Sequence, residues 1–309
     1  MSSTSPLPLL IDCDPGIDDA LALLLAAGSP ALDIRAVTCV AGNRPVEQTS
    51  LNARRVLDLA GADAVPVHAG CARPLTQAEP RSNLVHGADG LGGVALPLRG
   101  AVAAGHAIDV LVELLLAAAP GTLRLVALGP LTNLACAELR SPGLLRRAAQ
   151  IDVMGGAAFC PGNVNPHAEF NFYADPLAAQ IVLSAGAQLQ LFGLDVTEQA
   201  RMSDDWIASL AALPGPAAAA AQAMLRAYSG VDPLLHDVCP VAAVFAPELF
   251  DSAAHRVAVE WRDREREGRL LVDDAAAAAG DSAIARIVTR ANTPALLDTV
   301  AQALRRLGA

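Results

Sequence analysis

Short apolar runs that alternate with stretches of helical character limit the folds open to this chain. Strands that alternate with helices predict an α/β fold with one open, largely parallel (mixed) sheet and helices on both faces. The expected strands are Leu7–Ile11, Ile34–Val40, Val65–His68, Leu123–Leu128, Ile151–Met154 and Leu189–Val196. The expected helices between them are Ala20–Ala27, Val46–Leu59, Ile108–Ala118 and Leu131–Leu139.

Capping and turn residues set further boundaries. An aspartate followed by proline predicts a helix start, and glycine predicts a helix end. The elements expected on these grounds are a helix from Asp175-Pro176 to Gly186, a hairpin of Arg256–Trp261 with Arg269–Val272, and a helix from Thr293-Pro294. No internal repeat or linker divides the chain, so we expect one domain over residues 1–309.

Hydropathy and charge exclude several classes of protein. No stretch of about 18 uncharged apolar residues is present, and residues 1–8 lack the features of a signal peptide. The formal net charge of −10 argues against a nucleic-acid partner and is consistent with binding a cation. We therefore expect a cytoplasmic protein with no membrane partner.

The six cysteines show neither a CxxC pair nor a zinc-ligand spacing. Most lie in apolar runs, so we expect small core residues and no disulfide framework.

Four carboxylates lie within eight residues where the first strand meets the first helix: Asp12, Asp14, Asp18 and Asp19. One interpretation makes Asp14 a helix cap and lets Asp18 and Asp19 favour the helix dipole. It explains Asp12 less well. Four like charges beside a buried strand repel one another unless a cation or raised pKa values relieve them. Carboxylates, carbonyls and water are what Ca²⁺ prefers, so the cluster favours a metal site.

A phosphatase with an aspartate nucleophile would use the same pair, with Asp12 attacking and Asp14 as acid/base. That chemistry usually needs a nearby hydroxyl residue and a lysine to balance the phosphate charge. Here Pro15-Gly16-Ile17 follows the pair, and the chain contains no lysine. The additional acids would also repel phosphate, so this alternative is disfavoured.

An ordered set of short motifs resembles the nucleoside hydrolases that act on inosine, uridine and related nucleosides. They run in the family's order from residue 12 to residue 237, and one of them alone would carry little weight. The motifs are Asp12-Cys-Asp-Pro-Gly-Ile-Asp-Asp19, Val40-Ala-Gly-Asn43, His86-Gly, Leu128-Gly-Pro-Leu-Thr-Asn133, Met154-Gly-Gly156, Gly162-Asn163, Ala168-Glu-Phe-Asn171 and His236-Asp237.

The resemblance implies a calcium-dependent hydrolysis of the N-glycosidic bond of ribonucleosides. It makes Asp18 the general base on a water and His236 the group that contacts or protonates the leaving base. The implied calcium ligands are Asp14, Asp19, Asp237 and the main-chain carbonyl of Leu128, with Asp12 behind them. The implied substrate contacts are Asn43, His86, Met154, Asn163, Glu169, Asn171 and Tyr228.

Several of these residues also have plain structural interpretations. Asn43 and Asn163 suit turns, and Met154 suits a core. Strand-like alternation would put Glu169 and Asn171 on one face, available to a shared polar ligand. An apolar flank suits a buried core histidine at 236, and a neighbouring metal carboxylate suits a proton donor instead. For Thr132-Asn133 we expect only a helix entry. His86 is a second candidate to approach the base or ribose.

The identity of the base stays open. Tyr228 precedes His236 by about two helical turns if that segment is helical, and pyrimidine-preferring members of the family carry a tyrosine near this point. They also carry a polar residue where Met224 falls, so the pyrimidine preference is weakly supported. The other functions to weigh are hydrolysis of a different N-riboside and a non-catalytic protein that binds calcium and ribose. The resemblance implies a homodimer or homotetramer.

Overall fold

One nine-stranded sheet organises the computed structural model, which describes residues 5–273 and 283–309. The strand order is β3-β2-β1-β4-β5-β6-β9-β7-β8, and all neighbours from β3 to β9 pair in parallel. Strand β7 pairs antiparallel with both β9 and β8. The strands are β1 (Leu7–Cys13), β2 (Leu32–Cys39), β3 (Val67–Ala69), β4 (Arg124–Ala127), β5 (Gln150–Met154), β6 (Leu189–Phe192), β7 (Phe250–Val259), β8 (Leu270–Val272) and β9 (Ala283–Ala291). The predicted mixed, largely parallel sheet is confirmed.

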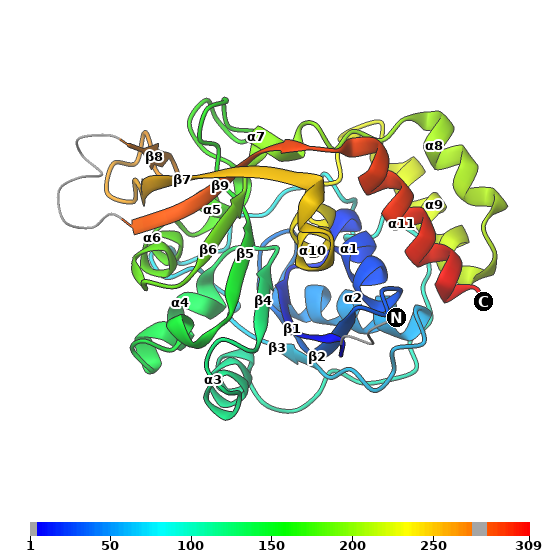
Figure 1. The fold of residues 1–309 in the computed structure, drawn as a ribbon, viewed down its shortest axis with the longest axis horizontal. Helices are drawn as coiled ribbons and strands as arrows, with labels where there is room; N and C mark the ends of the chain where they lie inside the picture. Colours follow the sequence, from blue (N-terminus) through cyan, green and yellow to red (C-terminus); the bar gives the residue numbers. More distant parts are fainter. Residues whose placement is uncertain (1–4, 274–282) are drawn as a thin grey trace.

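Helices cover both faces of the sheet, as expected (Figure 1). One face packs against α1 (Ile17–Ala27), α2 (Val46–Leu59), α9 (Gly215–Tyr228), α10 (Val238–Phe245) and α11 (Thr293–Leu307). The other face packs against α3 (Ala107–Ala117), α4 (Thr132–Arg140) and α6 (Pro176–Ser184). Among the described residues, the remaining α-helices are short: α5 (Phe170–Ala174), α7 (Leu194–Thr197) and α8 (Asp204–Ser209). Two buried apolar clusters therefore lie on opposite sides of the strands.

Helix α6 begins with the cap that was predicted, and α11 begins at the predicted Thr293 but is capped by the residue before it. The Asp175 side chain accepts from the Ala178 amide at the start of α6, with Pro176 at the first helical position. Asn292 caps α11 in the same way by accepting from Ala295. Such caps stabilise a helix by about 1 kcal/mol because they satisfy one of its free amides.

Two features of the C-terminal half differ from the predictions. The expected strand Leu189–Val196 ends at Phe192, because Gly193 turns the chain into α7. Gly193 packs against the Gly156 carbonyl so closely that an added Cβ would lie 2.5 Å from its oxygen. Strand β9 was not predicted; it joins β6 to the confirmed β7–β8 hairpin.

The cysteines are all free, but they are less uniformly buried than expected. Cys13, Cys39 and Cys239 are core residues, whereas Cys71, Cys136 and Cys160 are half-buried. Across residues 5–273 and 283–309, no helix combines the length and apolar character needed to cross a membrane.

Candidate active site

A pocket that is partly open to solvent lies beyond the carboxyl ends of the parallel strands. This is the edge at which open α/β sheets bind ligands. Its lining includes most of the expected site residues: Asp18, Asn43, His86, Leu128, Met154, Asn163, Glu169, Asn171, Tyr228, His236 and Asp237. Asp12, Asp14 and Asp19 are buried and are not part of this lining.

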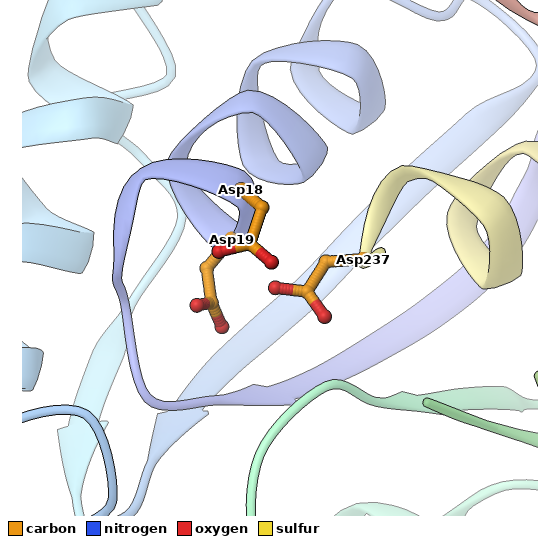
Figure 2. Close-up of side chains that lie close together, drawn as sticks. All are labelled: Asp18, Asp19 and Asp237. Carbon is orange, nitrogen blue, oxygen red and sulfur yellow. The ribbon is translucent and has the colours of Figure 1, made fainter. Parts of the chain in front are cut away.

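Three carboxylates from two distant parts of the chain converge at the floor of the pocket. Asp18 and Asp19 lie in the first turn of α1, and Asp237 precedes the first residue of α10. One oxygen of each lies within 4.8 Å of the others, and Figure 2 shows the three side chains grouped between the two helix starts. Asp14 is not a member of this group.

The charge of this cluster is poorly compensated by the protein itself. Burial raises the pKa of Asp19 to about 6, with a further contribution from the Asp18 charge. Burial and the neighbouring carboxylates likewise raise the pKa values of Asp14 and Asp237. One buried oxygen each of Asp14 and Asp18 lacks a hydrogen-bond partner among the described residues. A hard divalent cation accepts such oxygen donors, so the residues present fit a calcium ion.

Backbone contacts hold the acids in position. Asp19 accepts from the amides of Gly16 (2.9 Å) and Asp14 (3.2 Å). Asp14 in turn accepts from the Asn43 amide at 2.6 Å, and Asn43 Nδ2 donates to the Asp14 carbonyl at 3.2 Å. Asn43, expected as a sugar contact or a turn residue, therefore also ties the end of β2 to the acid cluster.

Two glycines leave room for the Asp14 carboxylate. A Cβ on Gly42 would lie 2.1 Å from one Asp14 oxygen, and a Cβ on Gly129 would lie 2.4 Å from the other. No side chain fits there without displacing the carboxylate. The glycines of the Ala-Gly-Asn and Leu-Gly-Pro motifs thus shape the position of Asp14.

A second layer of polar side chains supports the cluster from beneath. Asp12 accepts from Thr38 Oγ1 at 2.5 Å and from Asn133 Nδ2 at 2.8 Å. Burial raises the pKa of Asp12 to about 7 despite these hydrogen bonds. The helix α4 does begin at Thr132, as expected, but Asn133 is also a structural link, because its Oδ1 accepts from the Cys71 amide.

The segment around Glu169 differs from the predicted strand-like alternation. Glu169 is the N-cap of α5, and its carboxylate accepts from the amides of Asn171, Phe172 and Gly156. Asn171 lies inside the helix and donates through Nδ2 to the Leu128 carbonyl at 2.6 Å and to the Met154 carbonyl at 3.2 Å. Both residues still line the pocket. The helix start, rather than a strand, brings them to the same side.

A sequence model of the inosine-uridine preferring nucleoside hydrolases matches residues 9–298. The chain belongs to this nucleoside hydrolase family. The inosine-uridine preferring nucleoside hydrolase of Leishmania major is 35% identical, over 87% of this chain and 88% of that protein. The pyrimidine-specific ribonucleoside hydrolase RihA of Shewanella woodyi is 35% identical, over 96% of this chain and 97% of that protein. A solved plant nucleoside hydrolase matches with a TM-score of 0.89 at 31% identity, over 98% of this chain and 99% of that chain.

One side of the nucleoside hydrolase pocket carries aromatic and basic side chains; we call it the outer wall, and it consists of His86, Tyr228, Asp232 and His236. The rings of His86 and Tyr228 are stacked with their centroids 5.1 Å apart. His86 Nδ1 accepts from the Ile17 amide at 3.2 Å, and burial lowers the pKa of His86 to about 4. The segment between Tyr228 and His236 is not helical, contrary to the geometry considered from sequence, because α9 ends at Tyr228. Both side chains nevertheless reach the pocket.

His236 is held at both ring nitrogens. Nδ1 lies 2.8 Å from Thr197 Oγ1, and Nε2 donates to Asp232 Oδ2 at 3.2 Å. Burial acts to lower the pKa of His236, but the hydrogen bond to Asp232 and the charges of Asp18 and Asp232 outweigh it, so the pKa is raised. This histidine is buried, as a core residue would be, and it also lines the pocket, so its contact with the leaving base stays a prediction.

Four further residues of the nucleoside hydrolase pocket were not predicted: Asn83, Val85, Phe170 and Asp232. Asn83 belongs to the long segment between β3 and α3, and it donates to Asn43 Oδ1 at 2.8 Å. Asp232 precedes His236 by four residues, and only the folded connection between α9 and α10 reveals their contact. Thr197 was also missed, because α7 was expected to be part of a strand.

Proposed function

We propose that this nucleoside hydrolase splits ribonucleosides into free base and ribose with a bound calcium ion. The observation that carries the proposal is the convergence of Asp18, Asp19 and Asp237 within 4.8 Å at the pocket floor. Asp19 and Asp237 of this group would hold the ion with the Leu128 carbonyl and Asp14, which lies outside the group but has one buried oxygen without a hydrogen-bond partner among the described residues. When bound, calcium would supply coordination of the ribose hydroxyls and lower the pKa of a water.

Asp18 suits the role of general base. It lines the pocket, whereas Asp14 and Asp19 do not, and one of its oxygens has no hydrogen-bond partner among the described residues. Burial raises the pKa of Asp18, which brings a carboxylate closer to the range of an effective base. Asp18 would take the proton of the water that attacks C1′, and the C1′–N bond to the base then breaks.

Polar side chains opposite the acids would position the sugar. Asn43, Asn163, Glu169 and Asn171 line the pocket with Met154. Three backbone amides fix the Glu169 carboxylate and act against the rise in its pKa that burial causes, so this group is held in place beside an oxocarbenium-like transition state. Ordered donors and acceptors at this site hold ribose without a rearrangement during the reaction.

His236 is the better candidate to protonate the leaving base: the proton on Nε2, which Asp232 accepts in this structure, would pass to the base nitrogen released from C1′ and leave a neutral imidazole. Its pKa is raised by Asp232 and Asp18, whereas the pKa of His86 is lowered to about 4. A neutral His86 stacked on Tyr228 instead provides a flat wall for the base.

A pyrimidine base is the finer part of the proposal. Tyr228 in the pocket and the similarity to a pyrimidine-specific enzyme support it. Met224 does not replace a polar contact, because its side chain is buried in the core away from the pocket lining. Because the chain is also similar to an inosine-uridine preferring enzyme, purine nucleosides must be tested as substrates too.

The test is release of reducing sugar from uridine, cytidine, inosine, adenosine and guanosine, with calcium and after chelation. The proposal expects ribose release from at least one nucleoside, lost on chelation and restored by calcium. Binding of calcium and ribose without any release of sugar would identify the non-catalytic alternative. Release that is unaffected by chelation would refute the role of the metal.

A further inference from the structure

Asp232 is fixed by its own chain segment so that its carboxylate faces the pocket. It lies in the short connection between α9 and α10, where its amide donates to the Tyr228 carbonyl at 2.9 Å. Its Oδ1 accepts from the Leu234 amide at 3.2 Å, and its Oδ2 accepts from His236 Nε2 at 3.2 Å. The side chain is 25% exposed and lines the pocket. The carboxylate is therefore both held in place and accessible to a ligand.

The carboxylate remains ionised at neutral pH. Burial alone would raise its pKa, but the hydrogen bond and charge of His236 and the Leu234 amide outweigh burial, so the pKa is lowered. An ionised carboxylate only accepts hydrogen bonds, and its two oxygens have about four acceptor positions. The contacts to Leu234 and His236 occupy two of them. At least one acceptor position is thus left for a group in the pocket.

Asp232 belongs to the half of the pocket that would face the base. The proposed ion lies with Asp19 and Asp237, whereas Asp232 contacts His236 and donates its amide to the Tyr228 carbonyl. A base released from C1′ toward His236 would meet the Asp232 carboxylate beside the imidazole. The polar edge of the base is the ligand group that this carboxylate would meet.

Resting on the proposed nucleoside hydrolysis, we propose that Asp232 selects bases that carry an exocyclic amine. An aspartate accepts from the amine of cytosine, whereas the carbonyl at the same position of uracil offers only lone pairs and is repelled. A site that is built to hydrogen-bond a substrate group discriminates against the analogue that lacks it, because its own polar group is left unpaired. Among pyrimidine nucleosides, cytidine is then the favoured substrate over uridine.

The competing explanation is that Asp232 only orients His236. A loss of activity on its replacement would not separate the two, since both explanations predict one. The ratio of kcat/KM for a nucleoside with the amine to its partner without it does separate them. Orientation of His236 changes both members of such a pair equally, whereas selection by Asp232 changes the ratio.

The experiment measures kcat/KM of the calcium-loaded wild type, Asp232→Ala and Asp232→Asn with cytidine and uridine, and with guanosine and inosine. We expect the wild type to prefer the amine-bearing member of whichever pair it hydrolyses faster. Asp232→Ala should lower that preference by about 10- to 100-fold, the range for one hydrogen bond to a charged group. Asp232→Asn, whose amide can turn a donor toward a carbonyl, should shift the ratio further toward the member without the amine.

The matched control is Asp251→Asn, which alters an exposed aspartate on β7 whose carboxylate pairs with Arg290, and should leave the ratio unchanged. An equal fall for both members in Asp232→Ala would show that Asp232 only positions His236 and would overturn the inference. A wild type that prefers the member without the amine would overturn it as well. A wild type that releases no ribose from any nucleoside would instead refute the proposed function, and the inference with it.

Discussion

The floor and the outer wall of the pocket are built on opposite principles. At the floor, Asp14, Asp18 and Asp19 are buried and repel one another, and one oxygen each of Asp14 and Asp18 lacks a hydrogen-bond partner among the described residues. At the outer wall, His236 is held by Thr197 and Asp232, and His86 is stacked on Tyr228. An uncompensated cluster needs a cation to complete it, whereas a satisfied set of rings and hydrogen bonds can form before any ligand binds. We therefore expect the floor to hold the cation and the general base, and the outer wall to contact and protonate the leaving base.

The largest effect is expected at the floor, from Asp18→Asn. Removal of the base should lower kcat by about 10²- to 10⁴-fold, while an Asn of the same shape preserves the pocket. Steady-state kinetics of ribose release measure the change in kcat. Calorimetry should show that the variant still binds calcium. Asp205→Asn is the matched control, because Asp205 is an exposed first-turn acid of α8. An unchanged kcat in Asp18→Asn would show that Asp18 is not the general base.

The second test asks whether the acids of the floor need a cation. Without calcium, Asp237→Asn should melt at a higher temperature than the wild type, because it removes one of several buried like charges and no side-chain cap of α10 is lost. With calcium at about 100 times Kd, the wild type should gain about 2.7 kcal/mol and the variant much less. Thermal melts with and without calcium measure both effects.

A matched replacement separates this effect from a general loss of stability. Asp175→Asn changes another buried N-cap aspartate, one that caps α6 away from the cluster. It should destabilise the fold yet keep the calcium-dependent rise in melting temperature. An undiminished rise in Asp237→Asn would mean that Asp237 does not hold the ion.

Site residues that lie close together in the sequence could be predicted, whereas those that meet only through the fold could not. Asp14, Asp18 and Asp19 lie in six residues at a strand end, and the parallel sheet places that end at its ligand-binding edge. Asp237 could be predicted as a metal ligand only from the resemblance to the family, because no local sequence pattern connects it with Asp14. Asp232 and Asn83 act through contacts between loops, and no local pattern encodes such contacts.

The fold shows the same division. Strands β1, β2, β4 and β5 follow from local apolar runs, and their parallel pairing follows from the helices between them. The position of β9 between β6 and β7 depends on pairings far apart in the sequence, so it was missed. Glu169 and Asn171 were assigned to a strand although they lie at the start of a helix. The two structures could not be told apart, because both can turn residues two apart toward the same pocket.

Tyr228 tests whether the outer wall acts through its ring. Tyr228→Leu should raise KM by about 3- to 10-fold, because it removes a stacked partner of His86 worth about 0.5–1.5 kcal/mol. The value of kcat should change less, since the floor is untouched. Tyr228→Phe keeps the ring and is the matched control; an equal rise of KM in both variants would assign the effect to the hydroxyl instead of the stack.

The smallest effect is expected from Thr197→Val, which removes the partner of His236 Nδ1 and keeps the side-chain shape. One neutral hydrogen bond contributes about 1 kcal/mol, so kcat should fall by about fivefold with KM nearly unchanged. Thr299→Val is the matched control, because its hydroxyl bonds a carbonyl within α11, far from the pocket. The cytidine-to-uridine ratio should stay unchanged, because Thr197 acts only through the orientation of His236; a change in the ratio as large as that in Asp232→Ala would overturn the selection of the base by Asp232. If Thr197→Val lowers both rates alike, the orientation of the imidazole and the choice of base are separate tasks of two neighbouring side chains.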